Sequence, residues 1–456
     1  MTAWLVAQLG ARMHYAVPRI LNSAGMLEAL CTDVCAGRWA EPLSRLPAGL
    51  LPAGIERLAG RVPSGLPRRL IRTFPLFGLG YAARRAAART PAAMTAVHLW
   101  AGSAFCDAIV REGLGKAGAV YTFNSAGLGL LNQARELGLA TVVEQTIAPA
   151  PIGDALLAEE REAFPDWQPA LAPNRYRAAF RAREAGEWES ADLVVCGSEF
   201  VRDGIRRCGG PLERTAVVPY GVDAPFPPVV RSLSLRPLRV LTVGEVCLRK
   251  GTPYLLDAAT KLKKEATFRL VGSINVAAGA ERRLADAVEL TGPVPRRAIA
   301  WQLAWADVLL LPSLCEGSAT VCYEAFAAGV PVITTPNAGS VVRHGIDGFI
   351  VPIRDAEAIV AAIDTIRLNP SLLYNLSRNA ALRAREFTVE RYGERLLEAL
   401  SRVATWGRPF GLPPQAEPPS HVGQAVWPAQ AGGTACPTVN RYGAPAGATA
   451  CPTLKG

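Results

Sequence analysis

Two glutamates eight positions apart, and two cations upstream of them, are the side chains in this 456-residue sequence best placed to do chemistry. An apolar run precedes Glu316, and the pattern predicts a strand, a loop holding Glu316, and a helix with Glu324 about one turn inside it. Small residues between the two glutamates leave the N–H groups at the helix start exposed, and such a helix start binds anions. A diphosphate there would lie between two carboxylates, which are good acceptors for sugar hydroxyls. The loop and helix-start residues of this predicted donor site are Gly317, Ser318, Ala319, Thr320 and Val321.

An upstream segment supplies positive charge. The predicted strand Leu238–Val243 is followed by Gly244 and by a loop that ends in Arg249 and Lys250. Fixed positive charge beside a β-phosphate stabilises the nucleotide as a leaving group. Taken alone, the two cations would be interpreted as ordinary surface charge. At this distance upstream of the glutamate segment, the two cations favour a site that binds the diphosphate of a sugar donor.

Short apolar runs alternate with helical patterns in two blocks, which is typical of βα units around a parallel sheet. In the first block the predicted strands are Trp4–Leu9, Ala96–Trp100, Ala119–Phe123, Thr141–Glu144, Asp192–Cys196 and Thr215–Pro219. In the second they are Leu238–Val243, Phe268–Val271, Asp307–Leu311 and Pro331–Thr334, before a helical run over 356–403.

The fold class predicted is α/β, with two doubly wound, Rossmann-like parallel-sheet domains facing each other across a cleft. We expect an acceptor-side domain over 1–224, a donor domain over 225–385, and a closing helix over 386–405 that packs back towards the first domain. A Pro-rich joint, 224–228, links the two domains. Residues 406–456 are rich in Pro, Gly and Ala and hold too little apolar surface to fold, so we predict a disordered tail.

The composition narrows the cellular setting. No apolar stretch approaches 18 residues and no signal-peptide pattern opens the chain, so neither a transmembrane helix nor a secretory leader is expected. Ten scattered cysteines predict buried thiols in a reducing cytosol.

Much of the net charge of +10 comes from ten arginines between Arg38 and Arg89, interleaved with apolar residues. That stretch fits either peripheral contact with the anionic inner face of the cytoplasmic membrane or an ordinary solvated loop, and no motif for nucleic acid accompanies it.

The second block resembles the donor domain of retaining, GT-B-fold glycosyltransferases of family four, the glycosyl transferases group 1. The family's Glu-x7-Glu motif is matched by Glu316 and Glu324, its basic loop by Lys250-Gly251, and its base-contacting loop by Leu290–Val294, which ends in Val294. The resemblance implies a hexosyltransferase-like enzyme (EC 2.4) that moves a sugar from a nucleotide diphosphate sugar to an acceptor hydroxyl. It also implies retained anomeric configuration, no metal and no cofactor, in cell-surface polysaccharide or glycolipid synthesis.

In such enzymes Glu316 would contact the sugar hydroxyls and Glu324 the ribose, while Arg249 and Lys250 would take the place of a metal ion. The acceptor class that we expect is a lipid-linked or other oligosaccharide. Where the family commonly has an arginine after the strand glycine, this sequence has Glu245, and we hypothesise that Arg249 replaces that arginine.

The resemblance also implies a first-domain histidine near the sugar, at the end of a central strand. The matching segment, 142–146, has none, so Glu144 or Gln145 is a candidate replacement, and His98 on a neighbouring predicted strand is another. Gly10 and Arg12, in the first βα loop, are predicted to face the cleft. His14 in the same loop is a further candidate, unless it only packs or caps.

Three rival interpretations remain open on the sequence. One is a synthase or epimerase with the same fold, and another is a catalytically inactive homologue that binds glycans or nucleotides. The third is a nicotinamide enzyme, suggested only by a Gly-x-Gly-x-x-Ala pattern at 78–83 that follows no strand.

Overall fold

The computed structural model describes residues 2–36, 61–168, 172–223, 229–231 and 236–405. The predicted Pro-rich joint, the arginines at 38, 45 and 57, and the predicted tail lie outside the described residues.

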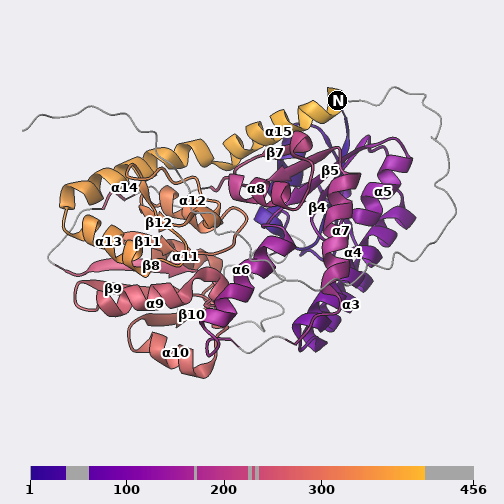
Figure 1. The fold of residues 1–456 in the computed structure, drawn as a ribbon. Helices are drawn as coiled ribbons and strands as arrows, with labels where there is room; N and C mark the ends of the chain where they lie inside the picture. The colour runs from indigo at the N-terminus through magenta and orange to yellow at the C-terminus, as the bar shows by residue number, and fades with distance from the viewer. Residues whose placement is uncertain (1, 37–60, 169–171, 224–228, 232–235, 406–456) are drawn as a thin grey trace, which may run out of the picture. The chain divides into compact units, whose positions relative to one another are not determined.

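Within the first block, seven strands of the described chain form one parallel sheet in the order β3-β2-β1-β4-β5-β6-β7 (Figure 1). The central strands are buried along almost their whole length, as apolar runs covered by helices on both faces must be. The strands are β1 Trp4–Gln8, β2 Leu27–Thr32, β3 Ile71–Thr73, β4 Ala119–Phe123, β5 Ala140–Gln145, β6 Leu193–Cys196 and β7 Thr215–Val217. The helices are η1 Arg12–Tyr15, α1 Ala16–Ser23, η4 Arg68–Leu70, α3 Pro75–Ala87, α4 Pro91–Glu112, α5 Leu128–Glu136, α6 Ala150–Ala163, α7 Arg177–Ser190, α8 Glu199–Arg207 and η5 Leu212–Arg214.

The second block builds a parallel sheet of six described strands in the order β10-β9-β8-β11-β12-β13. The two sheets confirm the predicted pair of doubly wound α/β layers. The strands are β8 Leu238–Val243, β9 Ala266–Val271, β10 Glu289–Gly292, β11 Val308–Leu311, β12 Val332–Thr334 and β13 Gly348–Ile350. The helices are η6 Leu248–Lys250, α9 Thr252–Lys261, α10 Ala278–Ala285, α11 Arg296–Trp305, α12 Thr320–Ala327, η7 Pro336–Ala338, α13 Ala356–Arg367, α14 Pro370–Ala384, η8 Arg385–Phe387 and α15 Val389–Thr405.

The strand predicted at Ala96–Trp100 is wrong, because this segment lies inside helix α4. Pro91 stands in the first turn of α4, and the Thr90 hydroxyl accepts the Ala93 N–H as an N-terminal cap. Together these two residues commit the chain to a helix before the apolar run begins.

Helix α4 is also long and apolar enough to cross a membrane, by length and hydropathy alone. Core helices pass the same test, and Phe105, Cys106 and Ile109 of α4 pack against the first sheet.

The sequence analysis also missed the strands β2, β3, β10 and β13, two of which are only three residues long and therefore give little periodic signal.

Helix α6 lies in the first block by sequence and packs against the second sheet. Leu157, Phe164 and Trp167, in α6 and just after it, join the hydrophobic cluster formed around β8 and β9. The Glu160 carboxylate of α6 pairs with the Arg354 guanidinium at 2.5 Å and accepts a hydrogen bond from the Tyr254 hydroxyl at 3.1 Å.

Helix α15 returns to the first sheet. Its buried residues Tyr392, Leu396 and Leu400 belong to the same hydrophobic cluster as Trp4 and Ile20. Just before it, the chain passes the segment that leaves the first sheet, and the Val222 N–H donates to the Phe387 carbonyl at 2.9 Å. The approach is so close that a Cβ atom at Gly221 would overlap the Thr388 carbonyl.

We therefore expect Gly221→Ala to lower the free energy of unfolding by about 1–3 kcal/mol, because both overlapping groups are backbone and neither can move aside. Urea unfolding followed by circular dichroism measures the change. The matched control is Gly279→Ala in α10, where an added Cβ meets no atom within 4 Å and should raise stability by about 0.5 kcal/mol. Equal stability of the two variants would contradict the close crossing.

Candidate functional site

The carboxylate of Glu316 lies between two cations. Glu316 follows β11 in a loop, and its Oε1 is 2.7 Å from Arg249 Nη1 and 2.6 Å from Lys250 Nζ. Arg249 Nη1 also donates to the Cys315 carbonyl at 3.1 Å. Burial, the largest single effect, lowers the pKa of Arg249, but the surrounding charges, of which Glu316 contributes most, together outweigh it and the pKa is raised. The structure thus brings together the three residues predicted to carry the chemistry.

Backbone contacts hold these residues at the carboxyl edge of the second sheet. Arg249 and Lys250 form the short helix η6, and the Leu314 N–H donates to the Arg249 carbonyl at 2.9 Å. Gly244 directly follows β8, and its N–H donates to the Val271 carbonyl at 2.9 Å. The basic loop and the glutamate loop therefore leave the ends of two hydrogen-bonded strands, β8 and β11.

The loop from Glu316 to Ala319 runs into α12, which starts at Thr320. The Glu316 N–H donates to the Asn337 carbonyl at 3.0 Å, and the Ala319 N–H to the Ala338 carbonyl at 3.2 Å. Ser318 Oγ is 2.6 Å from the Tyr323 hydroxyl. The first N–H groups of α12, from Thr320 and Val321, have no acceptor within their own helix, so the helix start can receive an anion.

Glu324 lies on α12 and is paired with an arginine that the sequence analysis missed. Arg296 Nη2, at the start of α11, is 2.5 Å from Glu324 Oε1. Burial raises the pKa of the Glu324 carboxyl, and the positive charge of Arg296 opposes that rise. Val294, two residues before Arg296, packs partly buried against the cluster that includes β11 and α12. The sequence signal that could have indicated this pair is an arginine two residues after the predicted base-contacting loop.

Glu245 contacts Asn275 more closely than it contacts Arg249. Its Oε1 accepts a hydrogen bond from Asn275 Nδ2 at 3.0 Å, while its Oε2 is 4.0 Å from Arg249 Nη2. Arg249 thus directs its shorter contact to Glu316. That Arg249 takes the place of the family arginine stays a prediction.

The first βα loop contacts the residues that follow β5. Arg12 Nη1 donates to Thr146 Oγ1 at 3.1 Å, and the Arg12 guanidinium lies 5.6 Å from the centre of the Phe123 ring. The Gly10 N–H donates to Asp33 Oδ1 at 3.0 Å. Ala148, two residues beyond Thr146, donates its N–H to the Glu316 carbonyl at 3.4 Å. Arg12 is therefore connected through Thr146 and the chain after it to the glutamate loop.

Glu144 is engaged inside the first half of the chain. It is buried, and its two carboxylate oxygens accept hydrogen bonds from the Tyr121 hydroxyl at 2.5 Å and the Tyr220 hydroxyl at 2.6 Å. Burial raises the pKa of Glu144, and the two tyrosine hydroxyls and Arg12 oppose that rise.

Gln145 is engaged in the same way. Its side-chain nitrogen donates to Glu184 Oε1 at 2.8 Å, and its side-chain oxygen accepts from the Trp188 ring at 3.0 Å. The polar atoms of both candidate replacements for a histidine thus have partners within the first half of the chain.

His98 does not lie on a strand as predicted. It lies on α4, half-buried, and burial followed by the charge of Arg85 lowers its pKa. The error has the same cause as that of the predicted strand, because the capped helix start carries this segment into α4.

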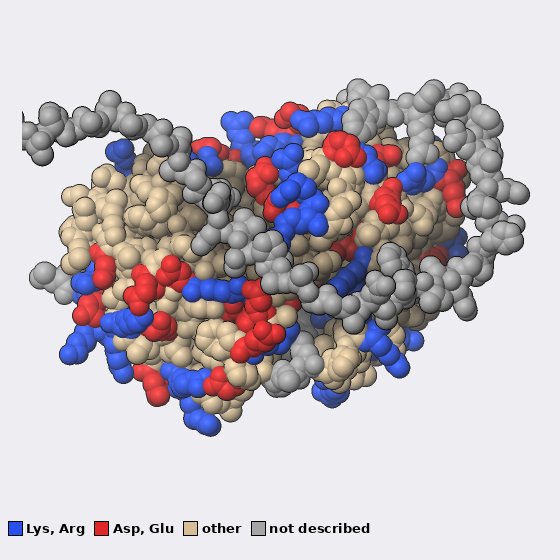
Figure 2. All heavy atoms as spheres, viewed as in Figure 1, with Lys and Arg blue, Asp and Glu red and all other residues tan. Residues whose placement is uncertain are grey.

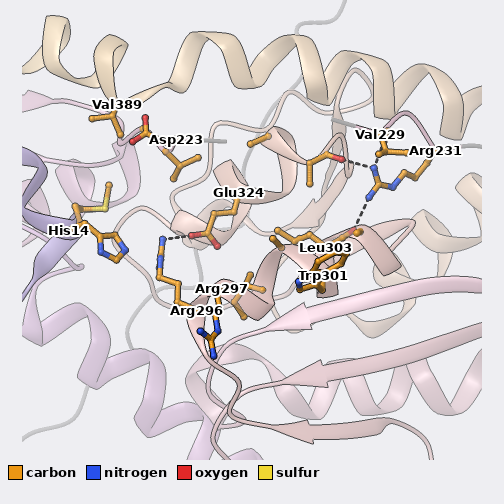
Figure 3. A pocket seen from close by; sticks show the side chains of 18 of the residues that line it. His14, Asp223, Val229, Arg231, Arg296, Arg297, Trp301, Leu303, Glu324 and Val389 are labelled. Carbon is orange, nitrogen blue, oxygen red and sulfur yellow. Dashed lines mark hydrogen bonds and ion pairs between the residues drawn. The ribbon is translucent and has the colours of Figure 1, made fainter. Parts of the chain in front are cut away.

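A cavity of about 480 Å³ lies beside Glu324 (Figure 3). His14 and Met13 from the first βα loop form one side of it, and Arg296 lies between His14 and Glu324. His14 was only an additional candidate in the sequence, because nothing in a local pattern connects it with a helix that starts some 300 positions later. Among the described residues, no cluster of three or more His, Cys, Asp or Glu side chains could hold a metal ion.

Comparison with known proteins points to one family. Residues 237–369 match the family model Glycosyl transferases group 1. The chain is 29% identical over 216 residues to the amylovoran biosynthesis glycosyltransferase of Erwinia amylovora, covering 43% of this chain and 53% of that protein. It is 30% identical over 206 residues to a putative colanic acid biosynthesis glycosyltransferase of Escherichia coli K12, covering 39% and 50%. The chain thus spans about half the length of these two relatives.

Solved structures share the fold over most of the chain. Sucrose-phosphate synthase from Thermosynechococcus elongatus superposes with a TM-score of 0.59 at 18% identity, covering 89% of this chain and 100% of that one. The Anabaena protein HepE in complex with UDP gives a TM-score of 0.55 at 17% identity, covering 88% and 100%. The two sheets of the described chain form the GT-B fold, and residues 237–369 are similar to the glycosyl transferases group 1 family.

Proposed function

We propose that this chain is a retaining glycosyltransferase that moves a sugar from a nucleotide diphosphate sugar to an acceptor hydroxyl, without a metal ion. The observation that carries the proposal is the Glu316 carboxylate held between Arg249 and Lys250, one loop before the start of α12. The family match and the glycosyltransferase names of the relatives support the reaction class.

The ion pairs fit a site that exchanges one anion for another. A donor diphosphate would bind Arg249, Lys250 and the α12 helix start, and would displace the Glu316 carboxylate from its two cations. The released carboxylate would then accept hydrogen bonds from the sugar hydroxyls. At the other end, Glu324 would accept from the ribose hydroxyls. Binding of UDP to the fold neighbour HepE is consistent with this use of the cleft.

In the proposed transfer, the bond between the anomeric carbon and the β-phosphate oxygen breaks, and the nucleoside diphosphate leaves with the electron pair. The acceptor oxygen forms the new bond on the same face of the sugar, and its proton passes to an oxygen of the leaving phosphate. Arg249 and Lys250 stabilise the charge that grows on this phosphate. Glu316 positions the sugar.

The acceptor that we propose is a lipid-linked or other oligosaccharide in cell-surface polysaccharide or glycolipid synthesis. The relatives named for amylovoran and colanic acid biosynthesis support that setting. We further propose that the protein is cytoplasmic and contacts the anionic inner face of the membrane.

The described part of the Arg-rich stretch supports the membrane contact. On α3, Leu76 and Leu79 are 88% and 66% exposed. Lys and Arg side chains lie interspersed with Asp and Glu over much of the face in Figure 2, whereas blue side chains occur without red ones beside them at the lower right, around α3. The exposed arginines of this region are Arg68, Arg69, Arg84, Arg85 and Arg89.

Substitutions at the two glutamates should change different kinetic constants. Once a screen of UDP-, GDP- and ADP-sugars has identified the donor, Glu324→Ala should mainly raise its Kd, because a ribose contact is lost. Glu316→Ala should mainly lower kcat, because the sugar is no longer positioned for transfer. Glu199→Ala, which removes an exposed glutamate of α8, is the control and should behave as wild type. Wild-type kinetics in both site variants would show that the site is misplaced, and failure to bind any sugar nucleotide would favour the inactive-homologue interpretation.

Removing the charge of Lys250 should lower kcat by about 10²–10³-fold, because the leaving diphosphate loses a fixed cation. Lys250→Ala is compared with Lys250→Arg, which keeps the charge and should recover part of the rate. Lys263→Ala, an exposed lysine after α9, is the matched control. A Lys250→Ala enzyme with undiminished kcat would exclude a role for this residue in stabilising the leaving group.

Flotation with lipid vesicles tests the membrane contact. The protein should float with vesicles that contain anionic lipid and should be released as salt is raised, since exposed charges are screened. The double variant Leu76→Glu/Leu79→Glu should lose flotation, whereas Leu368→Glu, at a 69% exposed leucine beyond α13, should not. Flotation that ignores lipid charge and salt would contradict the proposal.

A further inference from the structure

The cavity beside Glu324 is separate from the end of the site where the sugar is proposed to react. Its walls come from α11, α12, the first βα loop, the segment Gly221–Asp223 and the first residue of α15. The lining formed by the described residues does not include Arg249, Lys250 or Glu316. A molecule in this cavity would therefore lie beside the nucleoside end of a bound donor.

The body of the cavity is apolar. Ile299, Leu303 and Ala304 of α11 line it together with Ala327 of α12 and Ala328 just after that helix. Val222, Val229, Val389 and Met13 complete the apolar wall.

A buried arginine occupies the inner end. The guanidinium of Arg231 donates to the Ala306 carbonyl at 3.1 Å and to the Leu303 carbonyl at 2.8 Å, and it also contacts the carbonyls of Val229 and Ala328 (Figure 3). Because several carbonyls satisfy this group, the inner end favours an apolar ligand and needs no ligand charge.

The mouth of the cavity is cationic. Arg19, Arg296 and His14 all line the cavity, and the two arginine charges lower the pKa of His14 after the larger effect of burial. Over the whole lining, four arginines stand against the two carboxylates of Asp223 and Glu324. Figure 3 shows Arg296 between His14 and Glu324, to which it is paired.

The first βα loop reaches this mouth only in a strained backbone conformation. Met13, His14 and Tyr15 have φ values of 47°, 49° and 60°, a left-handed run that side chains with a Cβ rarely adopt. Tyr15 is fully buried in the core, which holds the loop in place while Met13 and His14 line the cavity. Strain of this kind persists where a particular geometry has a use.

We propose that this cavity binds an anionic amphiphile of the prenyl or alkyl monophosphate class, with the phosphate at Arg19 and Arg296 and the apolar chain between α11 and α12. A volume of about 480 Å³ is ample for a chain of about ten carbons. Since the ligand lies at the Glu324 end and not beside Glu316, it acts as an effector and is not the sugar acceptor.

The effector also changes donor binding, and this step rests on the proposed function. A phosphate at Arg296 competes with Glu324 for that guanidinium. Glu324 Oε1, now paired with Arg296, is thereby released for the ribose hydroxyls. The effector and the nucleotide should therefore each tighten the binding of the other, as linkage requires.

Geranyl phosphate is the probe for this site. It should raise the Tm of the full chain, whereas geraniol, without the anion, and inorganic phosphate, without the chain, should not. At saturation it should lower the Kd of UDP, measured by calorimetry, by about fivefold or more. Ala300→Phe, which fills the cavity from α11, should abolish both effects, and Ala361→Phe, at an exposed position of α13, should retain them.

Two further variants guard against a folding defect in Ala300→Phe. Arg19→Gln should weaken the Tm shift from geranyl phosphate, and Arg296→Gln should remove its effect on the Kd of UDP. A Tm shift as large with geraniol as with geranyl phosphate, or one unchanged in Ala300→Phe, overturns the binding site. Geranyl phosphate that binds but leaves the Kd of UDP unchanged overturns the coupling. If geranyl phosphate binds and UDP does not, the donor assignment fails and the cavity site stands.

Discussion

The rest of the structure depends on a close approach of two backbone segments, at Gly317 and at Thr146–Ile147. A Cβ atom at position 317 would overlap the Thr146 carbonyl, so only glycine permits this contact. The Ser198 hydroxyl donates to the Gly317 carbonyl at 2.5 Å, and the Ala148 N–H donates to the Glu316 carbonyl at 3.4 Å. Glu316 is thus placed against the first half of the chain by its own backbone, which leaves its side chain available for chemistry.

Around that contact, the site is a set of ion pairs ready to exchange partners. Glu316 is held by Arg249 and Lys250, and Glu324 by Arg296, and all five residues lie in loops and helices of the second block. In the absence of a ligand, the two carboxylates neutralise the cations. The phosphates of a donor would otherwise do so. Under the proposed function, a nucleotide diphosphate would meet cations already in position, and electrostatic preorganisation of this kind avoids reorganisation at the moment of reaction.

One buried connection joins the two halves of the chain, and a second holds the end of the first half in place. The Glu160 carboxylate of α6 bonds to Arg354 and Tyr254 of the second half, and Glu144 bonds to Tyr220 on the segment that leaves the first sheet. Breaking either would leave a buried carboxylate with fewer partners, which is costly in a low-dielectric interior. The first-half residues that the sequence offered as sugar contacts, Glu144 and Gln145, are thus occupied in holding the fold.

The sequence by itself determined the local units: nine of the predicted strands, and the strand–loop–helix segments that carry Lys250, Glu316 and Glu324. Hydrophobic periodicity, small residues and helix-start patterns are local properties, so they can be recognised without knowledge of the fold. Only the tertiary structure decided that His98 lies on a helix, that Arg296 pairs with Glu324, and that the loop holding His14 closes a cavity beside them. These outcomes depend on contacts between residues far apart in the chain, and such contacts are set by packing, which no local pattern records.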